Sequence, residues 1–326
     1  VVHCNDWQTA LVPVYLRELG RGAASVFTIH NIEYQGRLAL SSVTDLLGLS
    51  WERWHETLEM GSCANAMKAG MMTADAVTTV SPTYAGQLLD PAYACGLESV
   101  VRLCEGKLRG VLNGIDMQEY DPAADPLIPA HYSAQDLSGR AQCKAALQQS
   151  LGLTVDPNVP IIGMVGRLSS QKGLDLVDHV IGQIMEENVQ LVVLGMGESR
   201  YVNLFSWAEQ QYPGRVAARF QMDHQLAHRI YAGADMFLMP SQFEPCGLSQ
   251  MIAMRYGTLP IVRETGGLRD SVQPYNRFTG AGNGFTFFNY NAHDMLFTIR
   301  RALRYYHEHP DVWRELQSRG MNGDYS

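Results

Sequence analysis

Apolar runs alternate with amphipathic stretches across the second half of the chain. The apolar runs, rich in β-branched residues, read IIGMVGR, QLVVLGMG, RVAARF, MFLMPS and LPIVRE. The stretches between them have helical periodicity, over residues 173–187, 201–211, 224–233 and 247–256. Such alternation predicts βαβ units around a buried parallel sheet, and therefore an α/β fold.

Four loops that follow these predicted strands contain residues of unusual type. They are residues 166–173, 195–197, 241–247 and 265–267. The carboxyl ends of parallel strands share one edge of a sheet, and ligands of such sheets bind along that edge. We therefore expect the four loops to face one crevice.

Two of these loops have features that suit a diphosphate. The run VGRLSSQKG places Arg167 and Lys172 just before Gly173, which opens a helix. A planar guanidinium and a compact ammonium together suit a diphosphate held against helix-end amides. The run TGGLRD, residues 265–270, opens a second helix with glycines that let backbone amides approach a phosphate closely. The alternative for each loop is a solvated turn with surface cations.

A third loop, within PSQFEPCGLSQMIAM, contains a single carboxylate. Glu244 lies just ahead of the helix that Gly247 opens. One interpretation is that it only complements the positive end of that helix, an effect of about 0.3–1 kcal/mol. The remaining loop, GMGESR, lacks the third glycine of a dinucleotide-binding motif, so Gly195 and Gly197 indicate a loop near a ligand and not an NAD site.

The first third of the chain predicts part of a second α/β domain. VVHCNDWQTALVPVYLREL begins as a strand, turns at Asn5 and Asp6, and continues as a helix. Further strands are predicted at ASVFTIHN, DAVTTVSP and LRGVLNGID, with helices over residues 41–72. A segment rich in Pro, Asp and Ala follows, with a helix near residues 144–151, and indicates a linker. The expected domains are residues 1–115 and 116–326.

Composition excludes several classes of protein. The net charge of −8 over 326 residues argues against a nucleic-acid or anionic-membrane surface. Six cysteines without a CxxC pair indicate neither a zinc site nor a disulfide framework, and favour a reducing cytoplasm. No apolar run is long enough to span a membrane, and the first residues do not resemble a signal peptide, so we expect a soluble protein.

One histidine pair has a spacing that metal sites also use. His224 and His228 are four residues apart, but Gln225 stands where a zinc protease would need Glu. We therefore interpret the two side chains as a pair on a helix surface, and predict no metal.

Several blocks together resemble a known family. HCNDWQTALVP, FTIHNIEYQG, VLNGID, GRLSSQKG, GADMFLMPSQFEPCGLSQMIAMRYGTLPIVRETGGLRDSV and GNGFTF are similar, in order and spacing, to bacterial glycogen synthases. These are retaining GT-B glycosyltransferases of the starch synthase type. The resemblance implies two Rossmann-like domains whose parallel sheets face a central cleft. It also implies transfer of glucose from ADP-glucose to the nonreducing end of an α-1,4-glucan, without a metal or other cofactor.

The resemblance implies roles for residues of the donor side. Arg167 and Lys172 would contact the donor diphosphate, and Thr265, Gly266 and Gly267 would donate backbone hydrogen bonds beside it. Charge that develops on the leaving phosphate would then be stabilised. By the same resemblance, residues 116–326 comprise the linker and the nucleotide-sugar domain, and residues 1–115 belong to the acceptor-side domain.

The resemblance also implies residues around the sugar. Glu244 would contact the donor glucose, with Cys246 in the same catalytic turn, and His30 would line the sugar pocket. The alternative for His30 is an ordinary loop histidine. Asn5 and Asp6 would contact sugar or acceptor, although Asp6 could instead be a helix cap.

The sequence departs from the wider pattern in three places. The second Glu of the superfamily's E-x7-E motif is Ile252, so no carboxylate pair like that of retaining glycosidases is evident. We also expect the family's N-terminal Lys and Gly loop, and its final C-terminal helix, to be missing from this chain. Two alternatives remain: a catalytically weak sugar-nucleotide binder, and a retaining transferase of the sucrose or trehalose synthase type.

Overall fold

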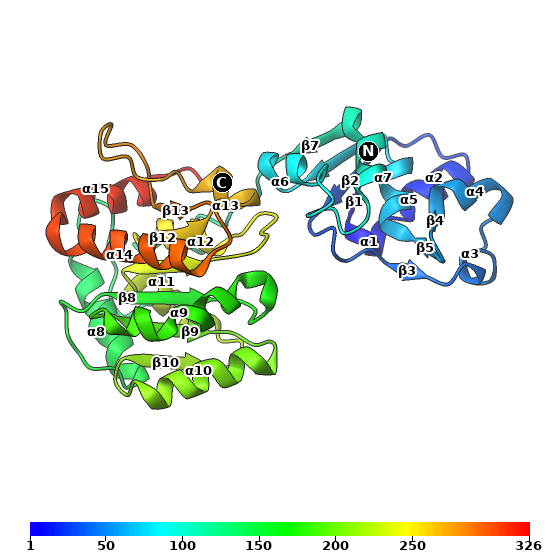
Figure 1. Cartoon of the computed structure of the whole chain (residues 1–326). Coiled ribbons are helices and arrows are strands. Elements are labelled where there is room, and N and C mark those ends of the chain that lie inside the picture. Colours follow the sequence, from blue (N-terminus) through cyan, green and yellow to red (C-terminus); the bar gives the residue numbers. More distant parts are fainter. The chain divides into compact units, whose positions relative to one another are not determined.

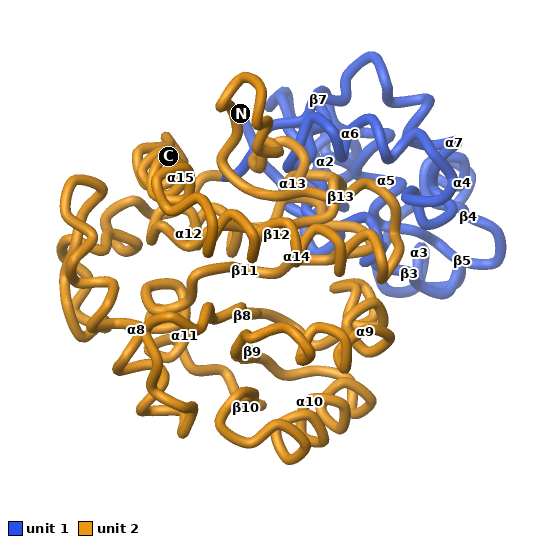
Figure 2. Tube along the Cα trace, turned by 60° about the vertical axis from the view of Figure 1, so that its left-hand side comes forward, with its two compact units in different colours: residues 1–113 blue, residues 114–326 orange.

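We describe the protein from a computed structural model that covers residues 1–326. The chain divides into two compact units, Val1–Asn113 and Gly114–Ser326 (Figure 2). Each unit has its own parallel sheet and its own hydrophobic core. No helix in the structure has both the length and the apolar character that crossing a bilayer requires.

The first unit is built on a parallel sheet of four strands, in the order β1-β2-β6-β7 (Figure 1). The strands are β1 (Val2–Asn5), β2 (Ser25–Ile29), β6 (Ala76–Thr79) and β7 (Leu108–Gly110). Their connections contain the helices α1 (Asp6–Thr9), α2 (Val12–Glu18), α5 (Ala66–Thr73), α6 (Pro82–Gln87), α7 (Glu98–Leu103) and η1 (Glu105–Lys107). Phe27, Ile29 and Val77 of the central strands are completely buried, so the sheet forms the core of this unit.

The prediction of helices throughout residues 41–72 is wrong in part. The structure has α3 (Ser41–Asp45) and α4 (Trp51–Leu58), but a hairpin follows, with β4 (Glu59–Met60) and β5 (Cys63–Asn65). With β3 (Arg37–Leu38) these strands form a small antiparallel sheet in the order β3-β5-β4. Gly61 has φ +63° at the first position of the two-residue turn, a conformation that favours glycine there. This turn reverses the chain where helical periodicity alone suggested continuity.

The second unit is built on a parallel sheet of six strands, in the order β10-β9-β8-β11-β12-β13. The strands are β8 (Ile161–Val165), β9 (Gln190–Leu194), β10 (Val216–Arg219), β11 (Met236–Met239), β12 (Leu259–Arg263) and β13 (Phe285–Phe287). All five residues of β9 and all four of β11 are buried, as expected of strands covered on both faces. The predicted α/β class, with parallel sheets, is confirmed.

Helices connect these strands along the chain (Figure 1). They are α8 (Ser138–Leu151), η2 (Ser170–Lys172), α9 (Leu174–Glu186), α10 (Ser199–Gln211), α11 (His224–Gly233), α12 (Ser249–Arg255), α13 (Gly266–Ser271), α14 (Ala292–Glu308) and α15 (Pro310–Met321). The apolar faces of α9 and α14 contribute to one continuous core with the strands. Three of the observed elements, β13, α14 and α15, were not among those predicted from the sequence.

Candidate active site

The strand order of the second unit contains one reversal. From β8 the chain builds outward through β9 to β10, returns to β11 beside β8, and then builds in the opposite direction through β12 to β13. The loops that follow β8 and β11 therefore diverge from two adjacent strand ends. Ligands of open α/β sheets bind at such a reversal, at the carboxyl ends of the strands. The loops concerned contain residues 166–173 and 240–247.

An ion pair joins these two loops. The Lys172 Nζ atom lies 2.5 Å from the Glu244 Oε2 atom, and the Ser241 hydroxyl donates to the same oxygen at 3.0 Å. The Glu244 side chain is only 8% exposed, whereas the Lys172 side chain is 28% exposed. An ammonium group has three donors, and Glu244 accepts only one of them. The pair therefore places an oriented carboxylate beside a cation that can still contact an anion.

Backbone contacts fix the two loops against each other. The Gln242 N–H group donates to the Gln171 carbonyl at 2.8 Å, and the Gln171 side chain donates to the Phe243 carbonyl at 3.3 Å. Gly173 has φ +70°, and a Cβ atom there would lie 1.9 Å from the Pro240 carbonyl oxygen. No side chain can be added at this position without separating the loops, so glycine is required for the Lys172–Glu244 geometry.

The predicted glycine turn, residues 265–267, packs against the backbone of the Glu244 loop. A Cβ atom on Gly266 would lie 2.0 Å from the Glu244 carbonyl oxygen, and one on Gly267 would lie 2.0 Å from the Cys246 carbonyl oxygen. The Gly267 N–H group donates to the carbonyls of Glu244 and Pro245, both at 3.1 Å. The turn therefore positions the backbone that carries Glu244.

This packing changes the expectation for two backbone donors. The Gly267 N–H group is engaged by Glu244 and Pro245, and the Thr265 N–H group donates to the Arg263 carbonyl at 2.9 Å. Neither group can bind a phosphate unless these bonds open. Cys246, in the same turn, is buried with 6% of its surface exposed.

Arg167 lies in the loop after β8 and is exposed. Its loop is held by residues 195–197: the Leu168 N–H group donates to the Met196 carbonyl at 2.8 Å. A Cβ atom on Gly195 would lie 1.8 Å from the Gly166 carbonyl oxygen, and one on Gly197 would lie 2.0 Å from the Leu168 carbonyl oxygen. These two glycines therefore allow close backbone packing that supports the loop of Arg167.

In the first unit, the structure brings together the three predicted residues at the carboxyl ends of β1 and β2. The His30 Nε2 atom lies 2.9 Å from the Asn5 Oδ1 atom, and the His30 N–H group donates to the Asp6 carboxylate at 2.8 Å. Asp6 also accepts from the Asn31 N–H group at 3.4 Å and has φ +54°, an uncommon conformation for a residue with a side chain. Asp6 therefore holds the backbone of the His30 loop in place. No side-chain hydrogen bond caps the start of α1.

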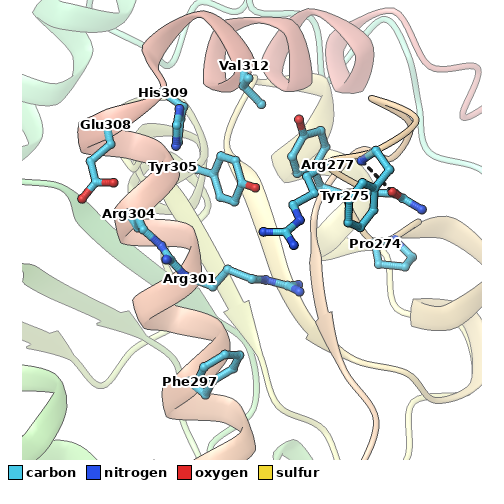
Figure 3. A pocket seen from close by; sticks show the side chains of 12 residues that line it. Pro274, Tyr275, Arg277, Phe297, Arg301, Arg304, Tyr305, Glu308, His309 and Val312 are labelled. Atoms are coloured by element: carbon cyan, nitrogen blue, oxygen red, sulfur yellow. Dashed lines mark hydrogen bonds between the residues drawn. The ribbon is translucent and has the colours of Figure 1, made fainter.

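A separate hollow of about 890 Å³ lies between residues 274–278 and α14 (Figure 3). Three arginines and several aromatic side chains line it, and two buried nitrogens of Arg301, Nε and Nη2, have no hydrogen-bond partner. Burial lowers the pKa of the Arg301 guanidinium. The loop that lines this hollow enters the amino end of β13, at the opposite edge of the sheet from Lys172 and Glu244. None of the predicted site residues lines it.

The prediction that His224 and His228 both lie on the helix surface is wrong for His228. His228 is 1% exposed, and its Nδ1 atom lies 2.7 Å from the Oδ2 atom of the equally buried Asp125.

Ser241, which orients Glu244, was not predicted as a site residue from the sequence. Its only signal was its position at the end of the predicted strand MFLMPS, where polar side chains often face a ligand.

The chain is similar in sequence and structure to several known proteins. Residues 1–103 match the model of the starch synthase catalytic domain, and residues 149–316 match that of the glycosyl transferases group 1. A glycogen synthase from Geobacillus thermodenitrificans is 49% identical over all of this chain and 68% of the relative, and one from Streptococcus gordonii is 44% identical over all of this chain and 70% of the relative.

The chain belongs to the glycogen synthase family. The resemblance drawn from the sequence blocks is thereby confirmed, and the protein is a glycosyltransferase. The solved catalytic domain of starch synthase IV from Arabidopsis thaliana, bound to ADP and acarbose, has a TM-score of 0.92 at 37% identity. That similarity covers 99% of this chain and 69% of the solved one. A sucrose-phosphate synthase from Thermosynechococcus elongatus, at 22% identity and a TM-score of 0.63 over 98% of this chain and 67% of that one, shares the GT-B fold.

Membership of the glycogen synthase family gives the geometry a chemical context. Enzymes of this family use a nucleotide sugar and a glucan. In this chain, Lys172 and Glu244 form an ion pair at the reversal of the strand order.

Proposed function

We propose that this glycogen synthase homologue transfers glucose from ADP-glucose to the 4-hydroxyl at the nonreducing end of an α-1,4-glucan, with retention of configuration. The observation that carries the proposal is the Lys172–Glu244 pair, which joins the loops after β8 and β11. The starch synthase IV structure, which binds ADP and acarbose, supports the choice of ADP and of a glucan. None of the six cysteines forms a disulfide, in keeping with a proposed cytoplasmic location.

In this proposal, the second domain, residues 116–326, binds the donor. Arg167 and Lys172 contact the diphosphate, because both are cations at the carboxyl edge of the sheet. Thr265 and Gly266 lie beside the phosphates, while Gly267 supports the backbone of the Glu244 turn. As the ADP leaves, the two cations stabilise the negative charge that develops on its phosphate.

Glu244 is proposed to face the donor glucose. Its carboxylate is buried and is held by Lys172 and Ser241, so its orientation is fixed before the donor binds. A carboxylate there stabilises positive charge that develops on the sugar in the transition state. Cys246 belongs to the same turn, where its buried side chain helps to shape the pocket.

Retention is proposed to proceed on one face of the sugar. The position of a second motif carboxylate is taken by Ile252, a buried residue of α12, so the motif offers no partner for a double displacement. The bond between C1 and the phosphate oxygen breaks as the acceptor oxygen bonds to C1 on the same face. The acceptor proton passes to the departing phosphate, and ADP is released.

The first domain, residues 1–115, is proposed to hold the acceptor side. His30 lines the sugar pocket, with Asn5 on its imidazole and Asp6 on its backbone. This arrangement fixes the ring of His30 relative to the ends of β1 and β2. A fixed ring suits contact with a sugar hydroxyl, because no rotamer freedom is lost on binding.

The test is transfer by the purified chain. The chain would be incubated with glycogen and radiolabelled ADP-glucose or UDP-glucose, beside a Glu244→Gln variant, and calorimetry would compare the binding of ADP and UDP. We expect label in glycogen from ADP-glucose, and little label with the variant. Binding of ADP without transfer would identify a sugar-nucleotide binder, and transfer only to a small sugar phosphate would favour the sucrose or trehalose synthase type. A glucosyl ester on Glu244 in mass spectrometry would disprove the one-face mechanism.

A further inference from the structure

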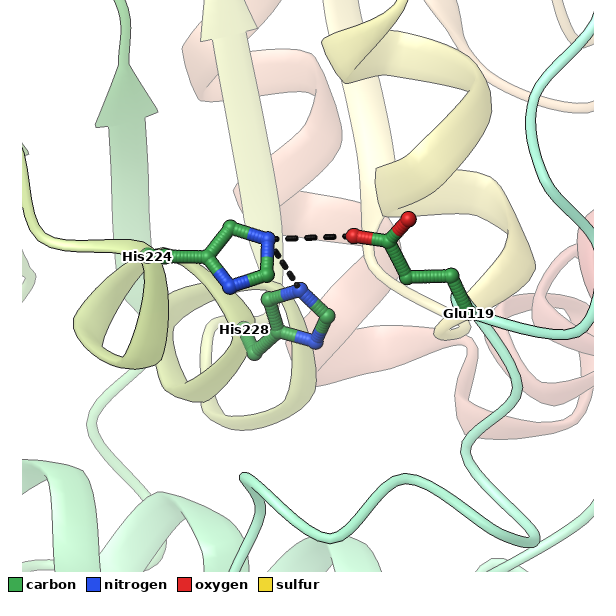
Figure 4. A group of neighbouring side chains, drawn as sticks. All are labelled: Glu119, His224 and His228. Carbon is green, nitrogen blue, oxygen red and sulfur yellow. Dashed lines mark hydrogen bonds and ion pairs between the residues drawn. The ribbon is translucent and has the colours of Figure 1, made fainter.

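A cluster of three side chains lies in the second unit, apart from the transfer chemistry (Figure 4). The Nε2 atoms of His224 and His228, one helical turn apart on α11, are 3.3 Å from each other. The Oε1 atom of Glu119 lies 3.1 Å from the His224 Nε2 atom, although Glu119 precedes His224 by 105 residues. One donor atom from each residue therefore lies within 4.8 Å of the other two.

A buried carboxylate sets the orientation of one histidine. Asp125 accepts from the Tyr256 hydroxyl at 2.5 Å and contacts the His228 Nδ1 atom at 2.7 Å. The Asp125 Oδ2 atom accepts both of these hydrogen bonds, and it is the nearest partner of the His228 Nδ1 atom. It therefore holds the His228 proton on Nδ1. In the neutral ring, the Nε2 atom then presents its lone pair to His224.

The cluster has more acceptors than protons. Both Glu119 and the His228 Nε2 atom approach the single Nε2 atom of His224. That atom carries at most one proton, which can serve one acceptor well. The other acceptor is then left without a donor, whereas one cation at the centre would accept a lone pair from all three atoms.

We propose that Glu119, His224 and His228 bind a divalent transition metal ion, of which Zn²⁺ is the best match. Two ligands about 2.0–2.1 Å from a tetrahedral zinc ion lie roughly 3.3 Å apart, close to both contacts within the cluster. A carboxylate that fixes the far nitrogen of a metal-binding histidine is a regular feature of zinc sites, and Asp125 occupies that place. Three protein ligands leave one position for water.

The site would join two parts of the second domain. Glu119 belongs to the segment before α8, and both histidines belong to α11, the helix that leads into β11. Tyr120, next to Glu119, stacks on His228 with ring centroids 5.1 Å apart, so the segment already lies against the helix. The metal fixes this contact, and none of its ligands contacts Lys172 or Glu244. The inference therefore does not depend on the proposed transfer reaction.

Metal binding by the full chain tests the proposal. Protein stripped with a chelator would be titrated with Zn²⁺ by calorimetry, and its zinc content after desalting would be measured by mass spectrometry. We expect one zinc per chain. His224→Ala and Glu119→Gln should each weaken zinc binding by at least about 10–100-fold. Loss of a residue that only orients a metal ligand already has an effect of this size. Both positions are exposed, so both variants should fold.

A matched control exists in the same domain. The rings of His179 and His293 also lie close together, with centroids 5.7 Å apart. These two histidines do not form a group of three potential metal ligands with a carboxylate. His293→Ala should bind zinc like the unaltered chain, and Co²⁺ in the unaltered chain should show the visible absorption of a four-coordinate site. Zinc binding that is absent, or that is unchanged in both His224→Ala and Glu119→Gln, would overturn the proposal. Equal loss in His293→Ala would also overturn it.

Discussion

Two lysine–carboxylate pairs in the second domain have the same chemistry and different surroundings. Lys144 pairs with Asp235 at 2.9 Å, and their side chains are 9% and 12% exposed. Lys144 also donates to the Pro157 carbonyl and the Tyr306 hydroxyl, both at 3.0 Å, so all three of its donors are used. Asp235 in turn accepts from the Ile161 N–H group at 2.9 Å.

The second pair, Lys172 and Glu244, is less complete. Lys172 donates only to Glu244 and is three times as exposed as Lys144, although Glu244 is as buried as Asp235. A saturated buried pair stabilises a fold, because every charge has its partners. A pair with open donors at a strand end is available to a ligand. The two pairs differ in how many other hydrogen-bond partners the lysine has. That number distinguishes a structural ion pair from one in a candidate active site.

The largest effect is expected where the saturated pair is broken. Lys144→Met leaves Asp235 buried without its counter-charge, which should lower the free energy of unfolding by about 3–5 kcal/mol. Urea denaturation followed by circular dichroism measures this loss. Arg200→Met, in an exposed pair with Asp178 at 3.0 Å, is the matched control and should cost about 0–1 kcal/mol. If Lys144→Met folded stably but lost transfer, the contrast between the pairs would fail.

Removal of the active-site charge should act on the rate and spare the fold. Glu244→Gln keeps the size of the side chain but removes its charge, so kcat should fall about 10²–10³-fold. ADP affinity should change little, because the proposed contact of Glu244 is with the sugar and not with the nucleotide. Steady-state kinetics and calorimetry separate the two. Glu209→Gln, in the half-exposed pair with Arg219, is the control. Equal losses of ADP affinity and kcat would return Glu244 to a structural role.

Removal of the cations should weaken use of the nucleotide sugar. Arg167→Ala and Lys172→Ala should each remove a proposed charge-assisted bond to the diphosphate, worth about 1.5–3 kcal/mol in kcat/KM. Lys172→Ala should also lower the melting temperature, since it leaves the buried Glu244 carboxylate with Ser241 and without a counter-charge. Normal kinetics in both variants would exclude the diphosphate assignment.

The smallest effect concerns alkaline pH. Burial lowers the pKa of Lys144, but Asp235 and Tyr306 outweigh it, and the net shift is above the ordinary 10.5. A raised folded pKa means that the contribution of Lys144 is complete below about pH 10.5 and is lost as pH rises through the folded pKa. The stability difference from Lys144→Met should therefore shrink above that pH, by at most about 1.4 kcal/mol per pH unit. A difference that grew there would show that the lysine is not stabilised as a cation.

Local patterns in the sequence predicted the sheet but could not predict every contact across it. The β-branched runs gave the strands, and helical periodicity predicted α11 at residues 224–233, where it lies. The alternation also placed Arg167, Lys172 and Glu244 after strands, because that depends only on chain order. The hairpin at β4 and β5 was missed, since Gly61 sits within a helix-like pattern.

Contacts between distant segments were beyond the sequence analysis. The burial of His228 depends on Asp125, and the approach of Glu119 to His224 joins residues that share no local pattern. The bonds that occupy the Gly267 N–H group also arise from packing of the turn on the Glu244 loop. Such contacts depend on which strands become neighbours, and strand order is not encoded by periodicity.

The reversal of strand order also has a consequence for folding kinetics. Lys172 and Glu244 are separated by 72 residues, which include β9 and β10, and they can meet only when β11 lies beside β8. Closing so long a loop is entropically costly and slow compared with local pairing. The pair should therefore be absent from the folding transition state. A nucleotide that binds it would slow the unfolding of the domain and leave its folding rate unchanged.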